Sequence, residues 1–158
     1  MKLDKTKLAA AIGVCLMAGF VGSFFTAPAI LTWYATLNKP AESPPSWVFA
    51  PVWTTLYILM GLALYLVWEK GYSDKKVRWA MHIFGIQLAL NIFWSVLFFG
   101  LRSPYYAFIE ILILGLMILA NAIAFYDIDK KAGIMLIPYM LWVSFATVLN
   151  YSVWQLNM

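Results

Sequence analysis

Charged residues are scarce in this chain. Asp, Glu, Lys and Arg together make up 11% of its 158 residues, whereas hydrophobic residues make up 64%. Soluble domains usually contain about 25% charged and about 45 to 50% apolar residues. The composition therefore excludes an ordinary soluble domain and indicates an integral membrane protein.

Side chains that ligate metals or act as nucleophiles are also scarce. The chain has one cysteine, Cys15, and one histidine, His82. A single cysteine can form no intrachain disulfide and no cysteine metal site. His82 could ligate a haem iron, but nothing supplies a partner ligand, and an interfacial or packed histidine fits better. Since the chain has no paired carboxylates and no nucleophile beside a base, we expect no metal site and no conventional hydrolytic catalysis.

Long apolar runs, by contrast, fill most of the chain. A transmembrane helix needs about 20 mostly apolar residues. Five runs satisfy this requirement, and they cover 8–27, 47–68, 79–101, 104–126 and 132–154. Glu110 is the only Asp, Glu, Lys or Arg within them. We predict an all-α integral membrane protein, a single five-transmembrane-helix bundle over 1–158, with a lid-like loop over 28–46.

The first run also has features of a cleavable signal peptide. Lys2, Lys5 and Lys7 precede it, and small residues follow it. Its length of about 20 residues and the absence of a soluble domain to export favour a retained membrane span.

The basic residues are distributed unevenly between the two ends of the predicted bundle. With five spans, one side holds nine of them: Lys2, Lys5, Lys7, Lys70, Lys75, Lys76, Arg78, Lys130 and Lys131. The other side holds Lys39 and Arg102. Under the positive-inside rule, we expect a cytoplasmic N-terminus and an external 28–46 loop in a bacterial-type cell membrane. The net charge of +4 is thus a topology signal, and we expect no nucleic-acid partner.

The segment between the first two runs is rich in proline. Pro40, Pro44, Pro45 and Pro51 follow Pro28 and lead directly into an aromatic helix. Because proline fixes one backbone angle, such a loop is stiff. We interpret it as a lid over a cavity.

Three of the predicted helices carry aromatic or polar residues at helical spacing. The three sets are Trp53, Tyr57 and Gly61, then Gln87, Asn91 and Ser95, then Trp142, Ala146 and Asn150. Residues four apart share a helix face. The aromatic residues could form a belt at the membrane interface, and the amides could simply join helices. The alternative is a shared ligand cavity.

Depth favours the cavity for most of these residues. At a rise of 1.5 Å per residue, six of these residues lie about 9 to 18 Å from the outer ends of their runs. The residues are Trp53, Tyr57, Asn91, Ser95, Trp142 and Ala146. A belt would lie at the surface instead. A cavity lined with Trp and Tyr fits a flat, largely apolar ligand with a few polar groups.

Other features leave alternatives open. Glu110 could pair with Arg102 or reach the interface, or it could line the cavity and couple to protons. Pro138 predicts a kink in the last helix. Small residues four apart allow close helix packing, either within the bundle or in a dimer. These small residues are Ala9, Gly13, Ala18, Gly22, Thr26, Gly85 and Ala89.

Four motifs resemble those of the translocator protein family, also called tryptophan-rich sensory proteins or peripheral benzodiazepine receptors. They are W-Y-x-x-L-x-K-P at 33–40, P-P-x-W-V-F-x-P-V-W-T-x-L-Y at 44–57, Q-L-A-L-N-x-x-W at 87–94 and P-Y-x-x-W-x-x-F-A-T-x-L-N-Y-x-V-W at 138–154. The resemblance extends over essentially the whole chain. It implies a five-helix bundle, usually a homodimer, that binds porphyrins such as protoporphyrin IX and haem-type tetrapyrroles, and in animals cholesterol and benzodiazepine-type drugs.

Matched residue by residue, the resemblance implies a ligand pocket under the loop joining the first two helices. Its lining is Tyr34, Pro44, Trp53, Tyr57, Asn91, Trp94, Ser95, Trp142 and Ala146. The implied function is tetrapyrrole transport, sequestration or sensing, with the porphyrin as ligand and no cofactor required.

Two other functions remain as alternatives. One is light- and oxygen-dependent porphyrin degradation, in which Trp53 and Trp142 would take part and no acid–base machinery is needed. The other is a small proton-coupled exporter that uses Glu110. Cholesterol is not expected as the ligand, because no basic residue follows Tyr151.

Overall fold

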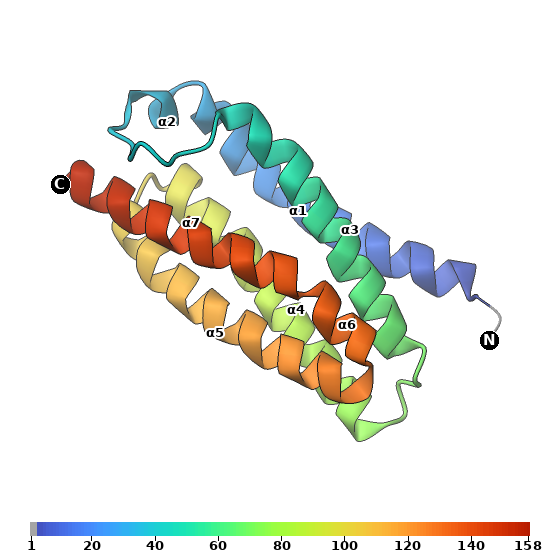
Figure 1. Cartoon of the computed structure of the whole chain (residues 1–158). Coiled ribbons are helices and arrows are strands. Elements are labelled where there is room, and N and C mark those ends of the chain that lie inside the picture. The colour runs from blue at the N-terminus through green and yellow to red at the C-terminus, as the bar shows by residue number, and fades with distance from the viewer. Residues whose placement is uncertain (1–2) are drawn as a thin grey trace.

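Five long helices dominate the computed structural model, which describes residues 3–158 (Figure 1). They are α1 (Lys5–Ile30), α3 (Phe49–Trp68), α4 (Lys75–Ser95), α5 (Pro104–Ile128) and α7 (Ile137–Leu156). Within the described residues, five helical stretches are long and apolar enough to cross a membrane. The predicted all-α bundle of five membrane helices is confirmed. Lys2, one of the basic residues counted above, lies outside the described range.

Four short helical segments complete the described part of the chain. They are α2 (Trp33–Thr36), the 3-10 turn η1 (Ser46–Val48), the π-helical turn η2 (Val96–Gly100) and α6 (Lys130–Met135). The predicted start of the loop at 28 is wrong, because α1 continues through Pro28 to Ile30. The connection from α1 to η1 covers 31–45 and contains α2. α4 begins four residues before 79, because the Asp74 carboxylate accepts a hydrogen bond from the Lys76 amide and caps the helix.

The two ends of the bundle differ. Residues 31–45, which we call the lid, lie at the same end as the C-terminus (Figure 1). We call this the lid end. The start of α1 and the turn between α3 and α4 lie at the opposite end, which we call the N-terminal end (Figure 1). α3 packs on α1, α4 packs on α5, and α5 packs on α7.

A break in the last span shapes the lid end. α6 ends at Met135, and α7 begins at Ile137, directly before Pro138. Proline cannot donate a backbone hydrogen bond, so the helix changes course here, as predicted. α3 packs closely on α6 but makes few contacts with α7. The break thus leaves room between α3 and α7 in the lid half of the bundle.

The small residues of α1 fall into two groups. Ala18 and Gly22 are buried in the bundle, and a Cβ atom at Gly22 would lie 3.3 Å from Ser95 Oγ of α4. Ala9 and Gly13 are exposed, and within residues 3–158 nothing lies within 4 Å of a Cβ atom at Gly13. Among residues 3–158, the first group is buried between helices and the second is not.

Two ion pairs are present at the N-terminal end. Lys7 Nζ lies 3.1 Å from Glu69 Oε1, and Lys70 Nζ lies 2.9 Å from Asp129 Oδ2. The hydrogen bond from Lys70 is the main reason that the pKa of Asp129 lies below its ordinary value of 3.8. The Asp129 carboxylate also accepts hydrogen bonds from the Lys131 and Ala132 amides, which cap α6.

Replacing Asp129 by alanine should destabilise the protein by about 1 to 2 kcal/mol at neutral pH, because a helix cap contributes about 1 kcal/mol and an exposed ion pair less. The folded-state pKa lies below the unfolded one, so this stabilisation is complete above about pH 4 and is lost as pH falls through the folded pKa. Thermal unfolding in detergent at neutral and acidic pH measures the difference. Asp127→Ala, which removes an exposed carboxylate two residues away, is the control. An Asp129→Ala deficit that persists unchanged at acidic pH would contradict the carboxylate's role.

Candidate functional site

A cavity of about 80 Å³ lies between α3, α4 and α7 in the lid half of the bundle. It occupies the room that the break before Pro138 leaves between α3 and α7. Its walls come from α1, the lid, α3, α4, η2 and α7. The lining residues are Thr26, Tyr34, Phe49, Trp53, Trp94, Ser95, Phe98, Phe99, Trp142, Phe145, Ala146, Leu149, Asn150 and Val153. We call this the main pocket.

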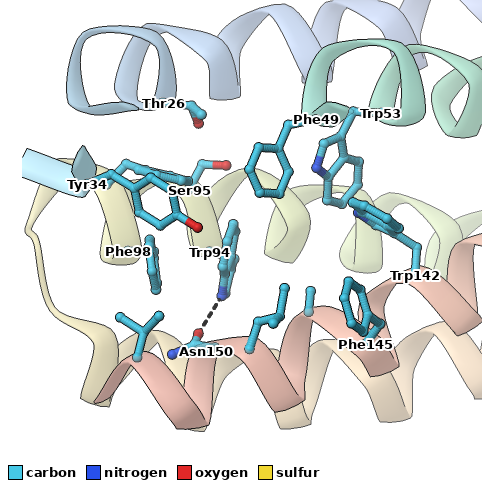
Figure 2. Close-up of a pocket in the computed structure, with 14 residues that line it drawn as sticks. Thr26, Tyr34, Phe49, Trp53, Trp94, Ser95, Phe98, Trp142, Phe145 and Asn150 are labelled. Atoms are coloured by element: carbon cyan, nitrogen blue, oxygen red, sulfur yellow. Dashed lines mark hydrogen bonds between the residues drawn. The ribbon is translucent and has the colours of Figure 1, made fainter. Parts of the chain in front are cut away.

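Aromatic rings form most of the wall of the main pocket. Figure 2 shows Phe49, Trp53, Trp142 and Phe145 gathered at one end, and Tyr34, Trp94 and Phe98 at the other. The rings of Trp94 and Phe98 are stacked with centroids 5.0 Å apart, and those of Phe49 and Trp142 meet edge to face at 6.4 Å. Flat faces at several angles suit a planar apolar ligand.

Helical spacing brings these rings together. The pairs Phe49 and Trp53, Trp94 and Phe98, and Trp142 and Ala146 are each four residues apart, so the members of a pair share a face of their helix. The wider π-helical turn η2 ends α4 and buries both Phe98 and Phe99 against the lid. Arg102, with a φ of 53°, then reverses the chain into α5.

Six of the nine residues in the predicted lining surround the main pocket. These are Tyr34, Trp53, Trp94, Ser95, Trp142 and Ala146. Asn91 lines a smaller inner cavity of about 10 Å³, whose wall also includes Trp53, Trp94 and Ala146. Tyr57 lines a groove between α1 and α3. Pro44 is not part of the wall of the main pocket as the described residues form it.

Asn91 is the centre of a buried hydrogen-bond chain that joins three helices. The Tyr57 hydroxyl donates to Asn91 Oδ1, and Asn91 Nδ2 donates to the Tyr139 hydroxyl at 2.9 Å. The Tyr139 hydroxyl in turn donates to Gln87 Oε1 at 2.9 Å. Both polar atoms of the Asn91 side chain are thus used by the protein. In this state the Asn91 amide joins helices, which is the first of the two alternatives given for the polar face of this helix.

A second hydrogen-bonded bridge holds one wall of the main pocket. Trp94 Nε1 donates to Asn150 Oδ1 at 3.0 Å, as the dashed line in Figure 2 marks, and Asn150 Nδ2 donates to the Pro104 carbonyl at 2.8 Å. Asn150 is 2% exposed. Since buried polar groups are costly unless paired, this bridge fixes the Trp94 ring relative to α5 and α7.

The lid closes the main pocket at the lid end. The Tyr34 ring packs against Phe49 and Phe99, with centroids 6.3 and 5.7 Å apart. Burial raises the pKa of the Tyr34 hydroxyl, so the side chain remains a neutral phenol that can donate a hydrogen bond. Asn38 and Asn157 hold the lid to the end of α7. The backbone N–H of Asn38 donates to Asn157 Oδ1 at 3.0 Å, and Asn157 Nδ2 donates to the backbone carbonyl of Asn38 at 2.8 Å.

The phenylalanines of the main pocket were absent from the predicted lining. Phe49 and Phe98 could have been found, because each lies four residues in sequence from a predicted tryptophan within the same apolar run. Phe99 could not, because its burial depends on the π-helical turn. Thr26 and Asn150 were noted as members of helix faces, without being assigned to the ligand.

Glu110 is buried on α5, where it is 5% exposed. Neither of its carboxylate oxygens has a hydrogen-bond partner within residues 3–158. The alternative in which Glu110 pairs with Arg102 is wrong. The ion pairs of the described residues are Lys7–Glu69 and Lys70–Asp129, and neither includes Glu110 or Arg102. His82 is exposed near the N-terminal end of the bundle.

Comparison with known proteins identifies the family. Residues 11–155 match the model of the TspO/MBR family. Tryptophan-rich protein TspO of Chlorobaculum tepidum is 45% identical over 150 residues, which cover 95% of each chain. Tryptophan-rich protein TspO of Archaeoglobus fulgidus is 43% identical over 152 residues, covering 96% of this chain and 97% of its own. The human translocator protein is 42% identical over 140 residues, covering 87% and 82%. The chain therefore belongs to the TspO/MBR family.

Proposed function

We propose that this membrane protein binds porphyrins and related flat apolar molecules in the main pocket, and that it transports, sequesters or senses them. One observation supports this most directly: aromatic rings from the lid, α3, α4 and α7 surround a single cavity in the lid half of the bundle. Apolar pockets lined by aromatic side chains and a few polar groups are typical of small-molecule sites. The names of two relatives, translocator protein and tryptophan-rich sensory protein, fit this class of function.

Ligand binding requires the main pocket to widen. Its volume of about 80 Å³ is well below the roughly 300 to 1,000 Å³ of pockets for drug-sized ligands. The lid is the segment best suited to move. Its hydrogen bonds to the end of α7 are few and exposed, and they include those between Asn38 and Asn157. Exposed contacts of this kind break at low cost compared with packed helices.

Titration of protoporphyrin IX into the purified protein tests this proposal. The eight tryptophans include three in the wall of the main pocket, so a bound porphyrin should quench their fluorescence. We expect saturable quenching with one porphyrin per chain. Quenching that rises linearly, and equally for free N-acetyltryptophanamide in the same detergent, would contradict a binding site.

A second candidate function is light-dependent degradation of the bound porphyrin. The observation that favours it is the presence of the Trp53 and Trp142 indoles in the wall of the main pocket, because oxidisable rings would lie beside an excited porphyrin. Illumination of the same complex in air distinguishes the two functions. A carrier leaves the porphyrin spectrum as it is in the detergent control. Degradation gives a defined product that disappears in Trp53→Phe and Trp142→Phe.

The setting that we propose follows from the charges and from the family. The excess of basic residues at the N-terminal end supports a cytoplasmic N-terminus in a bacterial-type cell membrane. The lid and the main pocket would then lie on the external side. The resemblance to the family supports a homodimer, and the exposed glycines Gly13 and Gly85 leave helix surfaces where a second copy could approach closely. The proposed binding needs no cofactor.

A further inference from the structure

The main pocket has a positive charge near its lid end but no charged group in its wall. All fourteen lining residues of the described chain are uncharged. At the lid end, Lys39 Nζ lies over the Tyr34 ring, 4.9 Å from its centroid, and the Tyr34 ring is part of the wall. At the inner end, the uncharged wall of the inner cavity includes Ile111 and Leu114 of α5. A ligand in the main pocket therefore has a cation near one end and an uncharged wall at the other.

The Lys39 ammonium is positioned but not neutralised. It donates to the Tyr34 carbonyl at 2.8 Å and to the Leu37 carbonyl at 3.1 Å. An ammonium has three N–H donors, so one remains available. Both carbonyls are uncharged, and the two ion pairs formed by the described residues involve other lysines, Lys7 and Lys70. The positive charge beside Tyr34 can therefore be matched by an anionic group of a ligand.

The inner end of the main pocket disfavours an anionic group. The walls of both cavities, as the structure describes them, contain no Lys, Arg or His. A ligand carboxylate placed here would lose its hydration and gain no cation in return, which is strongly unfavourable.

We propose that the main pocket binds a carboxylate-bearing planar macrocycle in one orientation, with its carboxylates at Lys39 under the lid and its apolar edge toward Ile111. This inference rests on the proposed function and specifies its ligand class. Lys39 is then a specificity-determining residue, which distinguishes an acidic porphyrin from its neutral ester. Tyr34 positions Lys39, because its carbonyl and its ring both hold the ammonium.

A pair of matched probes tests the orientation. Protoporphyrin IX and its dimethyl ester have the same ring, but only the first has free propionates. We expect the wild-type protein to bind the free acid about tenfold more tightly than the ester, since a partly buried charged hydrogen bond contributes roughly the 1.4 kcal/mol that corresponds to tenfold. Lys39→Gln should weaken binding of the free acid by a similar factor and leave the ester unchanged. Lys39→Arg should retain the preference for the acid.

Two controls separate this role from a purely structural one. Arg102→Gln removes the other basic residue of the lid end, which is exposed and outside the wall of the main pocket, and it should leave both affinities unchanged. If Lys39 only held the lid closed, Lys39→Gln would change the affinities for acid and ester by the same factor, and that result would overturn the inference. Equal wild-type affinities for the two probes would also overturn it while leaving the proposed function intact. Binding of neither probe would remove the proposed function itself.

Discussion

Replacing Gly61 by valine should greatly lower the temperature at which this protein unfolds in detergent. A Cβ atom at Gly61 of α3 would lie 2.6 Å from Ile12 Cα and 3.0 Å from Ile12 N of α1. The contact is with backbone, so a side-chain rotation cannot relieve it, and the two helices must separate. Overpacking of a core usually costs about 1 to 3 kcal/mol, and occasionally more. We expect the high end for valine, and a smaller but clear loss for Gly61→Ala, since alanine already adds the clashing atom.

Gly13→Val is the matched control for this prediction. Gly13 lies on α1 near Ile12, but within the described chain nothing lies within 4 Å of a Cβ atom there. We expect its unfolding temperature to stay close to that of the wild-type protein. Unfolding monitored by circular dichroism measures all three variants. If Gly61→Val and Gly13→Val unfold at the same temperature, α1 and α3 do not pack as closely as described here.

The sequence alone was sufficient to predict the spans, because each is a long apolar run and membrane insertion requires such runs. It also predicted the break at Pro138, whose chemistry is local. It could not predict which neighbour each face meets. Trp53, Tyr57 and Gly61 share a face by spacing, yet Trp53 lines the main pocket, the Tyr57 ring packs on Gly19 of α1, and Gly61 meets Ile12. Such assignments depend on helix crossing, which spacing does not determine.

The candidate pocket was predicted to a similar degree. Counting depth along each helix selected four residues that the structure places around the main pocket, namely Trp53, Ser95, Trp142 and Ala146. Tyr34 and Trp94 came from the family resemblance. The π-helical turn η2 has no simple sequence signal, so the burial of Phe99 was not foreseeable. The volume of the cavity was not foreseeable either, because it depends on how the rings of three helices and the lid are packed.

The buried amides show why a polar face in a membrane helix has two interpretations. Asn91 and Asn150 were both predicted to lie on inward faces, and both are buried. Asn91 joins Tyr57 and Tyr139 through its Oδ1 and Nδ2 atoms, whereas Asn150 connects the pocket residue Trp94 to the start of α5. Their polarity thus positions the aromatic side chains. In this state the ligand contacts available in the main pocket are mainly ring faces, with the hydroxyls of Tyr34, Ser95 and Thr26 as further polar groups.

Filling the main pocket from within should strongly weaken porphyrin binding and leave the fold intact. Ala146 of α7 lines both the main pocket and the inner cavity, so the ring of Ala146→Phe would project into the space that the ligand needs. We expect the affinity for protoporphyrin IX to fall by more than about tenfold, which corresponds to at least about 1.4 kcal/mol. The unfolding temperature should change little, because the ring enters existing space. Fluorescence quenching and thermal unfolding measure the two effects on the same preparation.

Val148→Phe is the matched control on the same helix. Val148 is 62% exposed on the surface of the bundle, so the same ring is added there on the lipid-facing side, and binding should remain at the wild-type level. If Ala146→Phe binds protoporphyrin IX as the wild-type protein does, the ligand does not occupy the main pocket. If Val148→Phe weakens binding as strongly as Ala146→Phe, the added ring acts through the helix as a whole, because Val148 is not part of the wall of the main pocket. A loss confined to Ala146→Phe places the porphyrin between α3, α4 and α7, which is the arrangement on which the proposed function depends.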